Sequence, residues 1–207
     1  MQAYGLILAG GKSTRMEGIH KGDLFYRRQT FLERAVQELG KETEEIWISY
    51  GEEDRGRREG CQIIMDEFPG CGPIGGIHSG LKNGKRQWAM VAACDMPFLE
   101  ISLYRFLFDK LEQANKARQP EYMGAVPFSE GKIHPLAAIY HKGLWKALER
   151  QIKKGKYRLT DALSQERILY VDLTKEEALG TMLQNINTTV EYKKLNREDY
   201  PSPDGAG

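Results

Sequence analysis

A short loop rich in glycines and cations combines the residue types that bind phosphate. It reads Leu8-Ala-Gly-Gly-Lys-Ser-Thr-Arg-Met16, and Lys21 follows five residues later. Gly10 and Gly11 lack Cβ atoms and tolerate positive φ, so the backbone N–H groups around them can turn toward a bound anion. The loop therefore predicts a nucleoside triphosphate site. The contacts expected in this part of the chain are Leu8, Ala9, Gly10, Gly11 and Lys21.

Three cations lie within a stretch of ten residues that overlaps this loop, at Lys12, Arg15 and Lys21. An arginine binds two phosphate oxygens with its planar guanidinium, whereas a lysine acts as a compact point charge. We expect Arg15 and Lys21 to hold the phosphates. The plainer alternative is a strand–turn–helix connection whose charges are only solvated.

A P-loop is a sharper alternative for the same residues. Gly11-Lys12-Ser13 matches the end of the P-loop pattern, but that pattern also requires glycine at position 6, where this chain has Leu6. Gly5 lies one residue too early and inside an apolar run. The sequence therefore argues against a P-loop.

Two carboxylates follow apolar runs that are typical of buried strands. Asp66 comes after residues 62–65, and Asp95 comes shortly after residues 88–93. Ligands of open α/β sheets bind outside the carboxyl ends of the strands, so we expect both carboxylates and the glycine loop at one edge. Asp95 suits Mg²⁺, which takes one or two carboxylates, phosphate oxygens and water. Each aspartate has a plainer alternative as a cap of the following turn.

Short apolar runs alternating with helical patterns must position these residues. The expected strands are residues 4–9, 45–49, 62–65, 88–93, 122–126, 136–140 and 168–171, and the expected helices are residues 30–40, 77–81, 102–116 and 143–154. This alternation predicts an α/β fold, a mainly parallel sheet with helices on both faces. We expect a single domain over residues 1–192 and a flexible C-terminal tail over residues 193–207.

Composition excludes several classes of function. The 207 residues include 30 basic and 29 acidic side chains, a net charge of +1, which lacks the basic excess of a nucleic-acid binder. No apolar stretch approaches the roughly 20 residues that cross a bilayer, so no membrane partner is expected. The three cysteines, Cys61, Cys71 and Cys94, favour reduced thiols over a disulfide framework or a zinc site, which predicts a cytoplasmic protein.

The glycine loop also resembles a known signature. Leu-Ala-Gly-Gly-x-Ser-x-Arg-Met over residues 8–16, with Lys21 five residues later, is similar to the loop of nucleotidyltransferases built on a Rossmann-like sheet. Within that family the whole chain resembles the molybdenum cofactor guanylyltransferases, which join GMP from GTP to molybdopterin. Two positions depart from the usual pattern, namely Glu17 where glycine is usual and His20 where an acid or amide is common.

The resemblance implies a Rossmann-like three-layer sandwich, GTP as substrate, Mg²⁺ as cofactor, and molybdopterin as acceptor. It also implies hand-over of the cofactor to or from other proteins of molybdenum cofactor biosynthesis. The residues it implies for catalysis are Arg15, Lys21 and Asp95, with Asp95 in the Cys-Asp-x-Pro motif as the metal ligand. The further nucleotide contacts it implies are Ser49, Asp66 and Gly72, and the acceptor contacts are His134 and Asn187.

The reaction expected from this resemblance is an in-line attack by the terminal phosphate of the acceptor on the α-phosphorus of GTP, with loss of pyrophosphate. The loop chemistry recognises phosphates and not bases, so guanine follows from the resemblance alone. Three alternatives remain. The first is a nucleotidyltransferase of the same fold that uses CTP or another acceptor. The others are a P-loop-like NTPase or phosphotransferase, and a nucleotide sensor without catalysis.

Overall fold

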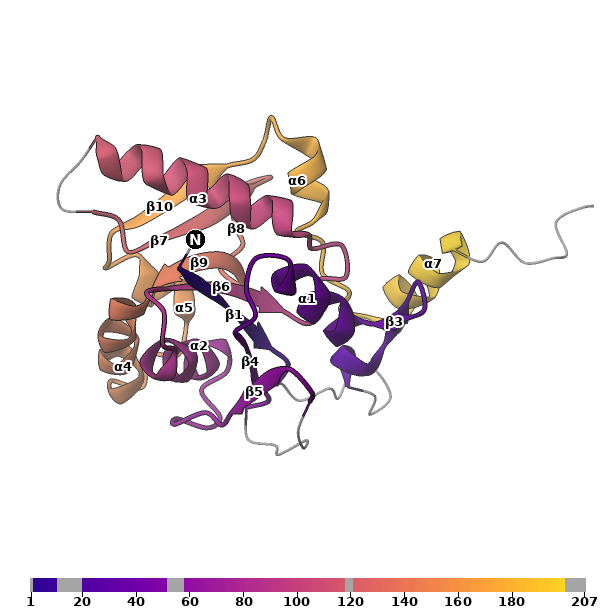
Figure 1. The fold of residues 1–207 in the computed structure, drawn as a ribbon, viewed down its shortest axis with the longest axis horizontal. Helices are drawn as coiled ribbons and strands as arrows, with labels where there is room; N and C mark the ends of the chain where they lie inside the picture. The colour runs from indigo at the N-terminus through magenta and orange to yellow at the C-terminus, as the bar shows by residue number, and fades with distance from the viewer. Residues whose placement is uncertain (1, 11–19, 52–57, 118–120, 200–207) are drawn as a thin grey trace, which may run out of the picture.

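The computed structural model describes residues 2–10, 20–51, 58–117 and 121–199, with side chains described as far as Leu195 (Figure 1). Within these residues, eight strands form one mixed sheet in the order β10-β7-β9-β6-β1-β4-β5, with β8 paired to β7. The strands are β1 (Ala3–Leu8), β4 (Ile46–Ser49), β5 (Cys61–Ile64), β6 (Trp88–Ala93), β7 (Gly124–Ser129), β8 (Lys132–Ile133), β9 (Ala137–His141) and β10 (Ile168–Asp172).

The sheet is mainly parallel, as the sequence predicted. The neighbours β1, β4, β5 and β6 run parallel to one another, and β10 runs parallel to β7. Strand β9 is antiparallel to both β6 and β7. The carboxyl ends of β1, β4, β5 and β6 therefore meet at a single edge of the sheet.

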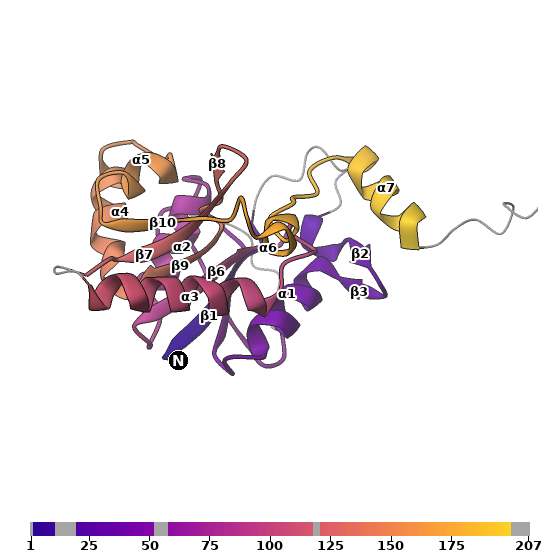
Figure 2. The same cartoon turned by 90° about the horizontal axis from the view of Figure 1, so that it is seen from above.

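Helices cover both faces of the sheet and make three layers (Figures 1 and 2). One face carries α1 (Phe31–Gly40) and α3 (Ile101–Lys116), and the other carries α2 (Pro73–Asn83), α4 (Trp145–Lys153) and α5 (Leu159–Leu163). Side chains of β1 alternate between the two cores, because successive strand residues point to opposite faces. Ala3 and Ile7 pack with the first set, and Tyr4, Leu6 and Leu8 pack with the second.

Helix α1 begins directly after Thr30, the first residue of the expected helix, which is its N-cap. The Oγ1 atom of Thr30 accepts a hydrogen bond from the Glu33 N–H at 3.1 Å, and the Glu33 carboxylate accepts one from the Thr30 N–H at 2.8 Å. This reciprocal pair is a capping box, which satisfies two backbone donors that the helix itself leaves without partners.

Helix α2 begins four residues before the expected start at Ile77. Gly72 has φ +70° and stands just before Pro73, whose fixed φ suits the first turn of a helix. Glycines on this helix let it approach the sheet. A Cβ on Gly80 would overlap the side chain of the buried Leu6, which would have to shift to admit it. The close packing outweighs a propensity cost of about 1 kcal/mol.

His78 is the one histidine on α2, and its side chain is fully buried. It lies between the rings of Phe68 and Trp145, with Nε2 4.0 Å from the carboxylate of Glu149. Burial lowers the pKa of His78, and Lys82 lowers it further, while the carboxylates of Glu67 and Glu149 oppose the shift. The folded protein therefore holds this ring neutral at pH values where the unfolded chain begins to bind a proton.

We expect the free energy of unfolding to fall as pH decreases from 8 to 5.5, because protonation then favours the unfolded chain. Urea denaturation at both pH values measures this, and His78→Leu should flatten part of the decline. The pKa values of His134 and His141 are also lowered by burial, so some decline persists in the variant. An unchanged decline in His78→Leu would contradict this prediction.

The chain beyond β10 contains structure that periodicity did not predict. Helix α6 covers Glu177–Thr181, and α7 covers Thr189–Asp199 beside a small hairpin of β2 (Phe25–Tyr26) and β3 (Gln29–Thr30) (Figure 2). The expected boundary at residue 192 thus falls inside α7, and residues 193–199 are helical where a flexible tail was expected. Leu195 stabilises this end of the chain by packing with Leu24, Tyr26, Phe31 and Ile186. None of the described helices has the length and apolar character needed to span a membrane.

Candidate active site

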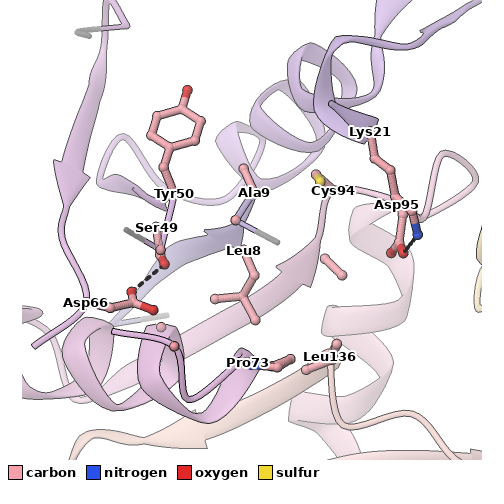
Figure 3. A pocket seen from close by; sticks show the side chains of 16 residues that line it. Leu8, Ala9, Lys21, Ser49, Tyr50, Asp66, Pro73, Cys94, Asp95 and Leu136 are labelled. Carbon is pink, nitrogen blue, oxygen red and sulfur yellow. Dashed lines mark hydrogen bonds and ion pairs between the residues drawn. The ribbon is translucent and has the colours of Figure 1, made fainter. Parts of the chain in front are cut away.

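The strand order places a crevice at the carboxyl end of β1. Strands β4 and β5 lie on one side of β1, while β6 lies on the other, so the chain reverses its direction of winding between β1 and β6. Ligands bind at such switch points in open α/β sheets. A cavity of about 630 Å³ opens here (Figure 3). Its lining residues are Leu8, Ala9, Gly10, Lys21, Ser49, Tyr50, Gly51, Asp66, Gly70, Gly72, Pro73, Gly76, Ala93, Cys94, Asp95 and Leu136.

Most of the predicted nucleotide contacts line this cavity. They are Leu8, Ala9, Gly10, Lys21, Ser49, Asp66, Gly72 and Asp95. Gly11 and Arg15 lie outside the described residues. Of the predicted acceptor contacts, which are both described, neither His134 nor Asn187 lines the cavity.

Gly10 has a structural role that the sequence did not reveal. A Cβ at this position would lie 2.7 Å from the carbonyl carbon of Tyr50 and 2.8 Å from the nitrogen of Gly51. Backbone atoms after β4 thus pass directly against Gly10 and exclude any side chain. The lack of a Cβ at Gly10 lets two loops pack against each other. This role is in addition to the approach of a phosphate that the sequence predicted.

We expect Gly10→Ala to destabilise the protein by about 1–3 kcal/mol, because one backbone segment must move to admit the methyl group. The same movement widens the junction of the two loops and weakens nucleotide binding. Urea denaturation and GTP titration measure the two effects. Gly40→Ala is the matched control, since a Cβ at Gly40 meets no atom within 4 Å. Equal stability of the two variants would contradict the contact.

One end of the cavity holds a serine–aspartate pair. Ser49 Oγ donates a hydrogen bond to Asp66 Oδ1 at 2.8 Å (Figure 3). The carboxylate also lies against the first turn of α2, because a Cβ on Gly75 would be 3.2 Å from Asp66 Oδ2. Negative charge is stabilised at the N-terminus of a helix. A carboxylate held in this way can accept hydrogen bonds from hydroxyl or N–H groups of a ligand.

The other end holds a lysine–aspartate pair. Lys21 begins a short 3-10 turn (Lys21–Asp23), and Asp95 follows β6 by two residues. Lys21 Nζ lies 2.7 Å from Asp95 Oδ2, and the two side chains are 24% and 16% exposed. Both groups thus reach the cavity and remain accessible to a ligand. Figure 3 shows this pair across the cavity from Ser49 and Asp66.

Residues from the C-terminal part of the chain complete this end. The Asn185 side chain donates to Asp95 Oδ1 at 3.3 Å, and the Ile186 N–H donates to the Asp95 carbonyl at 2.8 Å. Asn187 Oδ1 accepts from Lys21 Nζ at 2.7 Å. We had predicted Asn187 as an acceptor contact, and the structure places it on the lysine. Asn185 is not among the contacts that the sequence predicted, although it lies two positions before Asn187.

The sequence analysis also missed several residues that line the cavity. Tyr50 and Cys94 directly follow β4 and β6, positions that a strand-end rule would have found. Burial raises the pKa of Tyr50, against the opposing effect of Arg58. On the predicted acceptor side Leu136, and not His134, lines the cavity. The His134 N–H instead donates to the Pro127 carbonyl at 2.9 Å.

The site could hold a magnesium ion through a single protein ligand. Among the described residues, no three His, Cys, Asp or Glu side chains are grouped to hold a metal. Asp95 offers one carboxylate at the cavity, which suits a cation that takes its other ligands from phosphate oxygens and water. Asp95 Oδ2 already accepts a hydrogen bond from Lys21 Nζ, so an ion bound to that oxygen would share it with the lysine ammonium.

Comparison with known families decides the class of the protein. The family model described as "MobA-like NTP transferase domain" matches residues 5–168. The chain belongs to this family. A protein of Pelotomaculum thermopropionicum named "Probable molybdenum cofactor guanylyltransferase" is 34% identical over 197 residues, covering 94% of this chain and 92% of the relative. One of the same name from Halalkalibacterium halodurans is 30% identical over 193 residues, covering 90% and 94%.

Solved structures confirm the Rossmann-like nucleotidyltransferase fold. Molybdopterin-guanine dinucleotide biosynthesis protein A from Archaeoglobus fulgidus superposes with a TM-score of 0.78 at 22% identity, covering 96% of this chain and all of that one. The 2-C-methyl-D-erythritol 4-phosphate cytidylyltransferase of Thermus thermophilus gives 0.63 at 14% identity, covering 94% and 97%. At these identities the match describes the fold and not the substrate. Family membership makes this chain a nucleotidyltransferase, as the resemblance of the glycine loop implied.

Proposed function

We propose that this MobA-like transferase moves GMP from GTP to the terminal phosphate of molybdopterin, forming the guanine dinucleotide cofactor and pyrophosphate. The observation that carries the proposal is the Lys21–Asp95 pair, 2.7 Å apart, at the cavity beyond the carboxyl ends of β1 and β6. It supplies a cation for phosphate and a carboxylate for a metal in a chain whose relatives bear the guanylyltransferase name.

The transfer balances without a covalent enzyme intermediate. An oxygen of the acceptor phosphate forms a bond to the α-phosphorus of GTP, and the bond from that phosphorus to the bridging oxygen breaks. Pyrophosphate leaves with the electron pair. The attacking phosphate is already ionised near neutral pH, so the protein contributes placement and charge stabilisation.

Each end of the cavity has a distinct part in this proposal. Lys21 holds phosphate oxygens and stabilises charge on the leaving pyrophosphate, while Asp95 orients Lys21. Mg²⁺ on Asp95 would neutralise further phosphate charge. Arg15 adds a second cation by resemblance. The nucleoside lies toward Ser49, Asp66 and Gly72, where a carboxylate and the start of α2 accept and donate hydrogen bonds.

The acceptor is proposed to enter near Leu136, on the segment that also carries His134. Contacts of His134 and Asn187 with the acceptor remain our predictions, as do a cytoplasmic location and hand-over of the product to other cofactor-assembly proteins. The choice of GTP over CTP follows from the similar relatives, which bear the guanylyltransferase name.

Labelled GTP tests the reaction. With molybdopterin and Mg²⁺, a label on the α-phosphate should move to the acceptor, and a label on the γ-phosphate should appear in pyrophosphate. CTP should not replace GTP. Transfer from CTP would identify a cytidylyltransferase, and release of inorganic phosphate or GDP would identify a phosphotransferase or NTPase. Binding of GTP without either product would identify a sensor.

A further inference from the structure

The start of α7 joins the C-terminal part of the chain to the active site through one carboxylate. Glu191 Oε2 accepts hydrogen bonds from the N–H of Asn187 at 2.7 Å and from the N–H of Thr188 at 2.9 Å. The Glu191 N–H donates in return to Thr188 Oγ1 at 3.2 Å. This is a capping box extended by one residue, because the carboxylate also holds the residue before the cap.

The residue held by this extra bond is the one that contacts the catalytic lysine. Asn187 Oδ1 accepts from Lys21 Nζ at 2.7 Å, and Asp95 Oδ2 accepts from the same nitrogen at 2.7 Å. A lysine ammonium has three N–H donors. Two acceptors at fixed positions determine where the third donor points, and hence where a phosphate oxygen meets the ammonium.

The surroundings of Glu191 support an ionised carboxylate in this role. The N–H of Asn187 holds the pKa of Glu191 below its usual range, the groups of Thr188 and the charge of Lys21 act in the same direction, and desolvation opposes them. A charged acceptor makes a shorter and stronger hydrogen bond to backbone N–H than a neutral one does.

The helix itself has other anchors. Ile186 and Leu195 are buried beside Leu24 and Phe31. Tyr192 packs edge-on against Phe31 with ring centres 6.1 Å apart, and its hydroxyl accepts from the Phe25 N–H at 3.1 Å. Loss of the Glu191 carboxylate therefore leaves α7 attached, and its effect is concentrated on Asn187.

We propose that Glu191 is a positioning residue for Lys21: by binding the N–H groups of Asn187 and Thr188, it fixes the amide that holds the lysine ammonium beside Asp95. The consequence for catalysis rests on the proposed nucleotidyl transfer. The arrangement makes the C-terminal part of the chain, 166 residues away from Lys21, a component of the phosphate site.

The test measures the lysine directly. We would compare Glu191→Ala and Glu191→Gln with the wild type by the rate at which an amine-acylating reagent modifies Lys21, read by mass spectrometry of the Lys21 peptide. Lys116, whose side chain is 73% exposed, is the internal reference. Lys21 should react severalfold faster in Glu191→Ala and near the wild-type rate in Glu191→Gln, whose amide oxygen still accepts both N–H bonds.

Thr30→Ala is the matched structural control. It breaks the other capping box described above, at the start of α1, and both variants should lower the urea unfolding midpoint by a similar small amount. Only Glu191→Ala should change Lys21 acylation, and only it should lower kcat for GTP, by about tenfold, with a smaller change in KM. Asn187→Ala removes the amide alone and should accelerate acylation equally, which keeps the test valid if Glu191→Ala fails to fold.

The outcomes separate this proposal from the proposed function. Wild-type acylation of Lys21 in folded Glu191→Ala, or in Asn187→Ala, overturns the positioning role even if the wild type turns GTP over normally. A wild type that forms no pyrophosphate overturns the function, yet faster acylation in both variants would still establish the contact. Equal effects of Thr30→Ala and Glu191→Ala on acylation would reduce Glu191 to an ordinary helix cap.

Discussion

Asp95→Ala is expected to lower the turnover of GTP to pyrophosphate by a factor on the order of 10²–10³ or more, with the fold retained. The carboxylate orients Lys21 through Oδ2 and faces the cavity as the expected metal ligand. Its loss removes both charge stabilisation and placement of the phosphates. The main-chain bond from the Ile186 N–H to the Asp95 carbonyl is preserved in the variant, so the C-terminal segment stays in place.

Asp95→Asn refines this experiment. The amide oxygen still accepts a hydrogen bond from Lys21, but the neutral group is a poor ligand for Mg²⁺. Steady-state kinetics across Mg²⁺ concentrations should show that Asp95→Asn requires more metal and that Asp95→Ala gains little from any concentration. Wild-type turnover in Asp95→Ala, with the thermal unfolding midpoint unchanged, would remove Asp95 from the mechanism.

Lys21→Ala should produce a loss of similar size, again on the order of 10²–10³ in kcat. Among the described residues, Lys21 and Asp95 are the two that we assign to catalysis at this end of the cavity. Lys21 supplies the positive charge of the pair. Removing it leaves Asp95 beside the phosphates without its cation, which also adds repulsion to the bound triphosphate. Calorimetric titration should therefore show weaker GTP binding together with the lower kcat.

Lys82→Ala is the appropriate control for Lys21→Ala. Lys82 makes an ion pair of 2.7 Å with Glu67 and has a side chain that is 33% exposed, comparable with Lys21, but it does not line the cavity. A partly exposed ion pair contributes about 0–1 kcal/mol of stability. Both variants should lose a similar small amount of stability, and only Lys21→Ala should lose turnover. Equal turnover in the two variants would contradict the role of Lys21.

The sequence predicted the parts of the fold where one local signal dominates. Strands β1 and β6 are unbroken apolar runs buried on both faces, and the helical pattern expected over residues 30–40 matches α1. The strand-end rule then placed Asp66 and Asp95 at a common edge, and the family resemblance added Ser49; all three line one cavity.

Other features depend on contacts that no local pattern encodes. The β2–β3 hairpin turns at Arg27 and Arg28, with φ of 48° and 66°. Such turns favour Asn-Gly, so an Arg-Arg pair gave no hairpin signal. Helix α2 was predicted too short because glycines that break isolated helices here permit packing on β1. The bonds of Asn185 and Asn187 to the active site span 90 and 166 residues, beyond the reach of spacing rules.

The decisive experiment is a crystal structure with Mg²⁺ and a GTP analogue whose α–β bridging oxygen is replaced by methylene. We expect the α- and β-phosphates within hydrogen-bond reach of Lys21, an ion between them and Asp95, and the nucleoside beside Asp66 and the start of α2. Phosphates bound at the Asp66 end, or a nucleotide outside the β1–β6 crevice, would contradict it.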